Sequence, residues 1–354
     1  DVGDIAVRLQ EENFAVLLRD RPREHVDQIA QALLLRTRAH RFEIEGQTLH
    51  LTGSIGAGLL LGTGQGLEDL MTRASLACEV AQDAGGGHYH VYDQAADEKL
   101  RFARQTDLEQ QLRRALDADA FRTVFQPIPH LHAPAGENYE ALLRMVSAHG
   151  REVLPGEFLS AASNAGLMPQ IDRWVIRHAL GRLRQRQNER RPTRFFIKLD
   201  AQSVADDSML PWLAQQLREQ RVPGDRLVLE VSECAAARDL AAFQRLVAGL
   251  HELHCLCAME HAGRTPRAME VIAGLPVDYI KIDGSLTHDL ADNQSHQAAV
   301  KGLVDAAKAT GKRSIAPFVE DAKSLSLLWR WGADYVQGHY LQRPDARLQY
   351  AFET

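Results

Sequence analysis

Short apolar runs alternate with longer helical segments through the last two thirds of the chain, and this pattern restricts the fold more than any other feature. Eight runs of two to five residues lie at residues 123–126, 139–143, 195–199, 227–231, 256–259, 279–282, 314–318 and 335–336. Helical spacing of apolar residues is found between them, at residues 172–187, 239–253, 297–310 and 321–331. This order is typical of an α/β fold, the TIM-like (β/α)8 barrel. The carboxyl ends of its strands meet at one face, so the residues there are the candidates for function.

The first third of the chain has a different pattern. Strand-like runs at residues 14–18 and 49–61 and helical segments at residues 25–40 and 67–82 are joined by polar turns. This is too little apolar material to close a sheet over helices. Residues 94–117 carry leucines at helical spacing among Ala, Glu, Arg and Gln, which indicates an amphipathic linker helix. For a chain of 354 residues we therefore predict domains at residues 1–93 and 118–354, joined by this helix.

The composition excludes several classes of function. The formal net charge of −6 lacks the basic excess of proteins that bind nucleic acid or acidic membranes. Four scattered cysteines are too few for a disulfide framework in a chain of this length. No apolar run is long enough to span a bilayer and no signal peptide is evident, so we expect a cytoplasmic protein.

Three segments of the first domain carry a family resemblance. They are residues 8–14, where the family has Arg-x-Gly-Gly-Asp-Glu-Phe, the Thr-Gly-Ser-Ile-Gly run at residues 52–56, and the helix at residues 74–82. They resemble the second half of a GGDEF domain, the fold of diguanylate cyclases. Here Gln10 and Glu11 replace two glycines that let the backbone approach a phosphate, and Glu12 with Asn13 replaces the acidic pair. We expect no cyclase activity, because the first half of that domain is also absent from this sequence, and interpret the domain as a remnant kept for packing or dimerisation.

A longer series of motifs runs through the second domain. In order, the motifs are Phe125-Gln126-Pro127-Ile128, Glu140-Ala141-Leu142-Leu143-Arg144, Asp172-x-Trp174-Val175, Leu229-Glu230-Val231-Ser232-Glu233, Leu275-Pro276-Val277-Asp278, Lys281-Ile282-Asp283 and Val336-Gln337-Gly338. Their order and intervals resemble the EAL domain, the cyclic di-GMP phosphodiesterase family, over nearly all of residues 106–345. The resemblance implies an EAL-type barrel with a pocket for cyclic di-GMP.

The resemblance also implies a metal centre, most of whose positions have changed. Hydrolysis in the family uses divalent cations held by oxygen ligands. The corresponding positions are Glu140, Lys198, Glu230, Glu260, His261 and Pro317, and Lys281 matches the family's catalytic lysine. Lys198 stands where the family has an Asn ligand, and an ammonium about 4 Å from a cation costs on the order of 4 kcal/mol per unit charge at an effective dielectric near 20.

Lys198 has another interpretation, as a counter-ion that pairs with Glu140 or Glu230 and takes the place of the metal. We expect Lys281 to form a structural salt bridge in the same way. The sequence therefore predicts no catalytic residue, no bound metal and no requirement for a metal cofactor.

The residues that contact the nucleotide by resemblance are better preserved. They are Gln126, Glu140, Leu142, Arg144, Asp172, Phe318, Glu320, Gln337 and Gly338. Arg144 is suited to fork onto a phosphate or a guanine, and Asp172 and Glu320 can accept guanine N–H groups. Phe318 offers a face for base stacking, worth about 1–3 kcal/mol, and ordinary core packing is the alternative.

Four further segments narrow the resemblance within the family. Residues 172–176, 210–213, 317–320 and 350–352 resemble the FimX-type branch, which pairs degenerate GGDEF and EAL domains and governs type IV pili. The resemblance implies an inactive cyclic di-GMP receptor at the cell pole that acts in pilus biogenesis and twitching motility. It also implies a PilZ-domain partner and a homodimer formed through upstream domains. Two alternatives stay open: a weakly active metal-dependent phosphodiesterase using Glu140, Glu230 and Glu260, and a scaffold without ligand.

Overall fold

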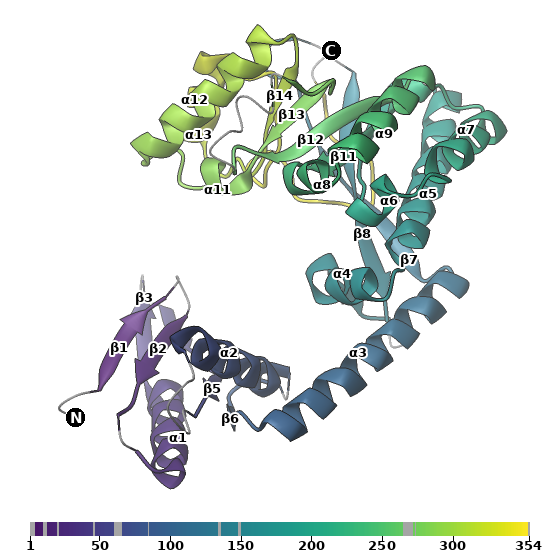
Figure 1. Cartoon of the computed structure of the whole chain (residues 1–354). Coiled ribbons are helices and arrows are strands. Elements are labelled where there is room, and N and C mark those ends of the chain that lie inside the picture. Colours follow the sequence, from purple (N-terminus) through teal and green to yellow (C-terminus); the bar gives the residue numbers. More distant parts are fainter. Residues whose placement is uncertain are drawn as a thin grey trace. The chain divides into compact units, whose positions relative to one another are not determined.

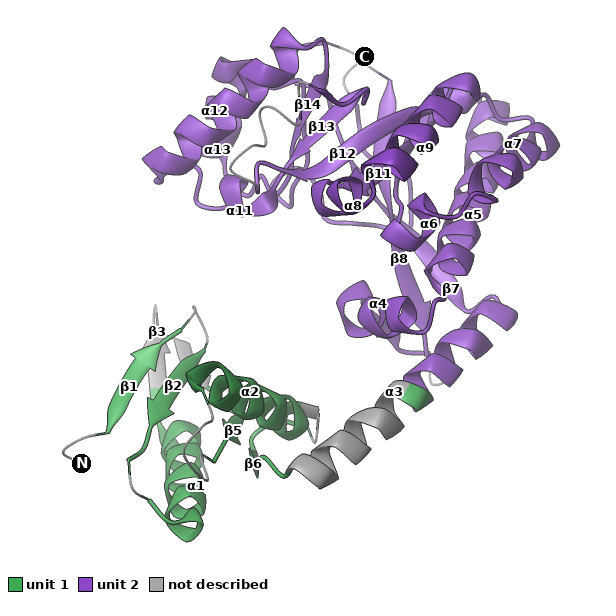
Figure 2. Ribbon diagram, viewed as in Figure 1, with its two compact units in different colours: residues 1–106 green, residues 107–354 purple. Residues whose placement is uncertain are grey.

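Two units make up the chain, residues 1–106 and residues 107–354 (Figure 2). The computed structural model describes residues 4–9, 13–19, 21–44, 47–59, 66–83, 85–133, 136–147, 150–264, 272 and 274–352. The boundary between the units falls within the long helix α3 (Gln94–Asp117). Among the described residues, no helix combines the length and the apolar character needed to cross a membrane.

The first unit holds three small sheets and two helices in its described part (Figure 1). Its elements are β1 (Ile5–Arg8), β2 (Phe14–Leu17), α1 (Arg23–Ala39), β3 (Arg41–Ile44), β4 (Gln47–His50), β5 (Ile55–Ala57), α2 (Leu67–Asp83) and β6 (Tyr89–Val91). β1 with β2 and β3 with β4 pair antiparallel, whereas β5 and β6 are parallel. The helices predicted at residues 25–40 and 67–82 are confirmed. The long strand or hairpin predicted at residues 49–61 overlaps the end of β4 and includes β5, and these two short strands pair with β3 and β6 and not with each other.

The described core of this unit is small. Its buried apolar residues are Ala30, Ala77, Ala81 and Val91. Larger apolar side chains on the β1–β2 hairpin, such as Ile5, Val7 and Phe14, are exposed instead. Burying a large apolar side chain contributes about 1.5–3 kcal/mol, so the described hairpin adds little to the stability of the unit by this route.

The second unit contains the remaining elements (Figure 1). After α3 they are β7 (Phe121–Pro127), β8 (Glu137–Val146), β9 (Glu152–Val153), α4 (Pro155–Asn164), α5 (Met168–Asn188), β10 (Thr193–Lys198), α6 (Ala201–Val204), α7 (Met209–Gln220), the 3-10 helix η1 (Gly224–Arg226), β11 (Leu227–Ser232), α8 (Glu233–Arg238), α9 (Leu240–Glu252), β12 (Leu256–Ala262), β13 (Tyr279–Ile282), α11 (Gly284–Thr287), α12 (Gln294–Ala309), β14 (Arg313–Ala316), α13 (Ala322–Trp331) and β15 (Tyr335–Val336). Each of the eight predicted apolar runs contains or overlaps one of these strands.

One curled mixed sheet organises this unit. Its strand order is β7-β8-β10-β11-β12-β13-β14-β15, with β9 paired to β8. Neighbours from β8 to β15 along this order are parallel. Single bridges from Phe125 to Asp345 and from His130 to Tyr335 connect the two ends of the sheet. The predicted α/β fold with a TIM-like barrel is therefore confirmed.

The first strand of the barrel differs from the simple (β/α)8 pattern, because β7 runs antiparallel to β8. Only residues 128–136 separate the two strands, and the described part of this connection contains no helix. A parallel pair needs a crossover of a dozen or more residues, whereas an antiparallel pair needs only a short turn. The short connection therefore determines the direction of β7.

Two layers of side chains share the inner face of the sheet. The lower layer is apolar and consists of Ile128, Phe196, Val228, Ala258, Tyr279, Ile315 and Tyr335. Side chains two residues apart on a strand share a face. The residues two positions after six of these are Lys198, Glu230, Glu260, Lys281, Pro317 and Gln337. Gln126 lies two positions before Ile128 because β7 runs the other way, so the alternation places all these residues at one end of the barrel.

The outer face of the sheet packs against helices. Phe195 and Ile197 of β10 point away from the inner layer and are fully buried in a large apolar cluster that includes residues of α5, α7, α9 and α12. Figure 1 shows these helices along the outside of the curved sheet. The second unit therefore has the extensive core that the described part of the first unit lacks.

A buried ion pair lies at the end of the barrel where the strands begin, opposite this polar layer. Arg186 of α5 contacts Glu137 at the start of β8 and donates to Thr193 Oγ1 (3.1 Å), which in turn donates to Glu137 Oε2 (2.7 Å). Arg191 also reaches Glu137 Oε1, at 2.8 Å, but its side chain is half exposed. Because all of these groups except Arg191 are buried, removing one partner leaves a charge with few alternatives.

We expect Arg186→Ala to lower the free energy of unfolding by about 3 kcal/mol, because Glu137 is left buried with only Arg191 as its ionic partner. Urea denaturation followed by circular dichroism measures the loss. Arg184→Ala, at an exposed position of the same helix, is the matched control and should change stability by less than about 0.5 kcal/mol. Equal effects of the two substitutions would contradict this account of the ion pair.

Candidate functional site

Five charged side chains meet at the carboxyl ends of the barrel strands. They are Glu140 on β8, Lys198 on β10, Glu230 on β11, Glu260 on β12 and Lys281 on β13. Lys281 Nζ lies 2.8 Å from Glu140 Oε2 and 3.1 and 3.3 Å from the two Glu230 oxygens. Lys198 Nζ contacts Glu260 Oε2 and lies 3.6 Å from Glu140 Oε1. We call these five residues the charge cluster.

The sequence prediction for the two lysines is confirmed in most respects. Lys281 forms the expected salt bridges, and Lys198 pairs with Glu140 as expected. Its second partner is Glu260, whereas Glu230, the alternative considered from the sequence, is bound by Lys281. The two lysines thus divide the three carboxylates between them and share Glu140.

Burial and the lysines shift the pKa values of the carboxyl groups in opposite directions. Burial disfavours the ionised form of Glu140, but Lys281 and Lys198 outweigh it and hold its pKa well below the usual range. Burial raises the pKa of Glu230 to about 8 despite Lys281, and the nearby Glu140 and Glu260 add to this shift. A proton on Glu230 would leave two carboxylates to balance the two ammonium groups of the charge cluster.

The residues at the implied metal positions do not fit a divalent cation. Mg²⁺ and Mn²⁺ prefer oxygen ligands, and here an ammonium lies between Glu140 and Glu260. His261 Nδ1 is 2.9 Å from Asp283 Oδ2, and Pro317 is buried without a side-chain donor atom. Within the described ranges, no group of three or more His, Cys, Asp or Glu side chains is arranged to hold a metal ion.

Two glutamines extend the charge cluster toward β7 and β15. Gln337 Nε2 donates to Glu140 Oε2 (2.5 Å) and to Gln126 Oε1 (2.9 Å). Gln126 Nε2 in turn donates to the backbone carbonyl of Gln342 (3.2 Å). The structure therefore brings together three of the residues assigned to the nucleotide by resemblance.

Arg144 lies further along β8, past the parallel part of the sheet. It shares a strand face with Glu140 and with the half-buried Leu142. Its Nε donates to Glu152 Oε1 (3.1 Å) and its Nη1 to the carbonyl of Leu143 (2.7 Å). Arg122 is the direct cross-strand partner of Arg144 and contacts the same Glu152.

Glu152 therefore has a role that sequence analysis missed. Two arginines directly opposite each other on neighbouring strands repel, and a carboxylate between them offsets this repulsion. Glu152 reaches them from β9, a two-residue strand paired to the end of β8. So short a strand has no recognisable period in the sequence, whereas Arg144 was found through its place in the family motif at residues 140–144.

Asp172 is buried on α5, and protein donors already use one of its oxygens. Asp200 N (2.9 Å) and Ser203 Oγ (2.6 Å) both donate to Asp172 Oδ2. Burial raises the pKa of Asp172 to about 7 in spite of these hydrogen bonds. The carboxyl group holds the start of α6 against α5, and its contact with guanine stays a prediction.

Phe318 and Glu320 lie on the loop that follows β14, on the rim of a pocket of about 360 Å³. Phe318 is 57% exposed and has a φ of 55°, a left-handed conformation that is rare for a bulky residue. Its ring lies directly over the backbone of Gly284, since a Cβ on that glycine would come within 2.5 Å of the ring carbons. Core packing, the alternative considered from the sequence for Phe318, is therefore wrong.

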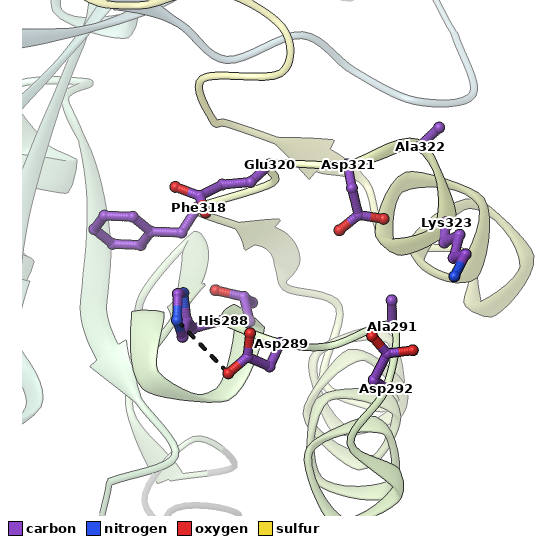
Figure 3. Close-up of a pocket in the computed structure, with 10 residues that line it drawn as sticks. His288, Asp289, Ala291, Asp292, Phe318, Glu320, Asp321, Ala322 and Lys323 are labelled. Carbon is purple, nitrogen blue, oxygen red and sulfur yellow. Dashed lines mark ion pairs between the residues drawn. The ribbon is translucent and has the colours of Figure 1, made fainter. Parts of the chain in front are cut away.

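Four of the ten residues that line the same pocket are acidic. Its lining comprises Thr287, His288, Asp289, Ala291, Asp292, Phe318, Glu320, Asp321, Ala322 and Lys323. Figure 3 shows the Phe318 ring directed away from the carboxyl groups of Asp289 and Asp292, with the Glu320 side chain beside it. His288 Nε2 is 3.6 Å from Asp289 Oδ2. An aromatic face and an acceptor carboxylate thus stand side by side at this rim.

Gly338 has a structural reason to be glycine. A Cβ at this position would lie 2.0 Å from the carbonyl oxygen of Val319 and 2.4 Å from its nitrogen. Val319 N donates to the Gln337 carbonyl, and Tyr340 N donates to the Val319 carbonyl. The backbone of the Phe318 loop therefore lies directly against the strand end that carries Gln337.

Several residues of the sequence prediction lie outside the described residues. They are Gln10, Glu11 and Glu12 of the GGDEF-like turn. In the described part of that turn, the guanidinium of Arg8 lies 5.8 Å from the centre of the Phe14 ring. The predicted loss of cyclase activity stays a prediction.

Known proteins resemble the chain over both units. Residues 1–88 match the sequence model described as "Diguanylate cyclase, GGDEF domain". The FimX EAL domain of Pseudomonas aeruginosa bound to cyclic di-GMP is 40% identical, covering 70% of this chain and all of that one, with a TM-score of 0.66. The Xanthomonas citri FimX EAL domain in complex with cyclic di-GMP is 29% identical, covering 72% of this chain and 99% of that one, with a TM-score of 0.68.

Full-length relatives are more distant. Cyclic di-GMP phosphodiesterase PdeB of Shewanella oneidensis is 26% identical over 99% of this chain and 41% of its own length. The chain spans half or less of the length of the first curated relatives that it matches. The sequence model of the EAL domain matches residues 109–344, well over half of the chain, and the chain therefore belongs to the EAL domain family.

Proposed function

We propose that this chain is a cyclic di-GMP receptor that binds the nucleotide without hydrolysing it and signals through a protein partner. The observation that carries the proposal is the charge cluster, in which two ammonium groups occupy the space between carboxylates that would otherwise hold divalent cations. The solved FimX EAL domains with bound cyclic di-GMP support nucleotide binding by a relative at 40% identity.

Phe318 supports a retained nucleotide pocket. A bulky side chain in a left-handed conformation costs on the order of 1–3 kcal/mol, and such strain is concentrated at functional sites. The ring is exposed at the pocket rim with Glu320 beside it, where it can stack on a base while the carboxylate accepts guanine N–H groups. A scaffold without a ligand would gain nothing from this arrangement.

A weakly active phosphodiesterase is the second candidate. It is favoured by the meeting of Glu140, Glu230 and Glu260 at one end of the barrel and by curated relatives with that activity. Against it, a metal would have to displace Lys198 from both Glu140 and Glu260. We therefore rank the receptor first.

The biological setting is proposed from the FimX-type resemblance. It consists of regulation of type IV pilus biogenesis and twitching motility from the cytoplasmic side of the cell pole, a PilZ-domain protein as partner, and a homodimer. The similarity to the two FimX EAL domains supports this setting. We also propose that residues 1–93 are a degenerate GGDEF remnant, joined by residues 94–117 to a degenerate EAL domain at residues 118–354.

Calorimetric titration of the purified protein with cyclic di-GMP in EDTA tests the proposal. We expect saturable binding without metal, and chromatography of the recovered ligand should show intact cyclic di-GMP. Binding only after addition of Mg²⁺ or Mn²⁺, together with a linear product, would favour the phosphodiesterase. No binding in either buffer would favour the scaffold.

Arg144→Ala should weaken cyclic di-GMP binding by roughly 10- to 150-fold, the equivalent of losing a hydrogen bond to a charged group worth about 1.5–3 kcal/mol. Calorimetry measures the affinity and urea denaturation checks the fold. Arg151→Ala is the control, because Arg151 is exposed and pairs with Glu157. Undiminished affinity of the Arg144 variant would remove this residue from the pocket.

Lys198→Asn restores the ligand type of the family at one position only, and we expect no hydrolysis from it in Mg²⁺ or Mn²⁺. Pro317 still supplies no oxygen, and His261 stays bound to Asp283. Chromatography of cyclic di-GMP after overnight incubation detects the linear product. Turnover by this single variant would mean that the centre is less altered than we infer.

A further inference from the structure

Lys198 differs from the other members of the charge cluster in its exposure. Its side chain is 48% exposed, whereas the exposed fractions are 6% for Lys281, 4% for Glu140, 0% for Glu230 and 10% for Glu260. The carboxylates and Lys281 are thus enclosed by protein, and Lys198 is the part of the charge cluster that a ligand entering from solvent would meet.

The position of Lys198 on its strand explains this exposure. Lys198 is the last residue of β10, two positions after the inner-layer residue Phe196, and therefore points into the barrel at the open end of the sheet. In the parallel register it is opposite Glu230 of β11, which is fully buried. After Lys198 the strand ends, and the chain continues within two residues into α6.

The contacts of Lys198 fix its ammonium but do not exhaust its donors. A lysine ammonium has three N–H donors. One is used by Glu260, and a second can be directed at Glu140 Oε1, 3.6 Å away. Both carboxylates are buried and the Lys198 side chain is half exposed, so we infer that the third donor is the one available to a ligand that enters from solvent. Two buried anions thus hold one cationic donor toward solvent.

We propose that this donor binds a phosphodiester oxygen of the bound nucleotide, so that Lys198 is a ligand-binding residue in its own right. The inference rests on the proposed function and deepens it. Lys198 would then do more than fill the place of a metal, because it would offer the ligand the positive charge that a cation offers elsewhere in the family. The ligand chemistry is that of a phosphodiester anion.

The buried carboxylates do not prevent this contact. Glu140 and Glu230 are each bound by Lys281, and Glu260 by Lys198. Coulomb interactions weaken with distance, and a phosphate hydrogen-bonded to Lys198 lies nearer to the ammonium than to carboxylates on its far side. A simpler role remains to be separated from the proposal, namely that Lys198 only balances the charge of Glu140 and Glu260.

The experiment compares Lys198→Gln with the double variant Lys198→Gln/Glu260→Gln, by calorimetry with cyclic di-GMP in EDTA. The double variant removes one positive and one negative charge, so its cluster carries the same formal charge as that of the unaltered protein. We expect both variants to bind at least 10-fold more weakly than the unaltered protein, because both lack the donor.

Three results would overturn the proposal. Unchanged affinity of Lys198→Gln would mean that the ligand does not use the ammonium. Recovery of full affinity in the double variant would mean that Lys198 acts only through charge balance. Lys198→Arg keeps a charged donor at this position and should lose less affinity than Lys198→Gln, so an equal loss in the two would also count against it.

Two controls keep the interpretation specific. Lys301→Gln removes a charge from an exposed lysine of α12 that pairs with Asp305, and its affinity should match that of the unaltered protein. Circular dichroism should show every variant folded at the temperature of the titration, and the urea midpoint of Lys198→Gln should be the lowest, because this variant leaves Glu260 without its lysine partner. If the unaltered protein itself fails to bind in EDTA, the receptor proposal falls together with this one. If the unaltered protein binds and the Lys198 variants bind equally well, only the proposed role of Lys198 is overturned.

Discussion

The alternation of side chains along each strand places the functional residues together at one end of the barrel. Each of six inner strands contributes one apolar residue to a buried layer and, two positions later, one residue to the layer above. A slip of one residue in any strand pair would turn the upper side chain outward and bring an outer apolar residue in. Phe196 and Tyr279 therefore set the positions of Lys198 and Lys281 as firmly as the salt bridges do.

The lysines of the charge cluster offset the repulsion between carboxylates that the fold brings together at its strand ends. Carboxylates gathered at strand ends in a poorly solvated interior repel one another, and leaving one of them without a counter-charge is strongly destabilising. Lys281 and Lys198 supply the counter-charges from within the chain, and a raised pKa at Glu230 reduces the remaining excess. The three acidic strand ends are thus balanced in large part by side chains of the chain itself.

The sequence predicted best those elements whose apolar residues repeat with a regular period. It predicted least well those features that depend on one contact or on the length of one connection. The strands and helices of the second unit follow from apolar spacing. The family resemblance placed Lys198 near Glu140 and Glu230 but did not decide between these two partners. The antiparallel direction of β7 depends on the length of one connection, and Glu152 acts from a strand too short to show a period. The left-handed backbone of Phe318 has no signal in the sequence, since nothing there marks a bulky residue for positive φ.

Gly338 has a consequence for how relatives of this chain are compared. Because no side chain fits between this residue and Val319, selection for a folded barrel alone would preserve the glycine, even in a descendant that had lost every nucleotide contact. Retention of Gly338 across a lineage would therefore be uninformative about ligand use. The exposed Phe318 fills no space in the core, so drift at that position would track the fate of the pocket more faithfully.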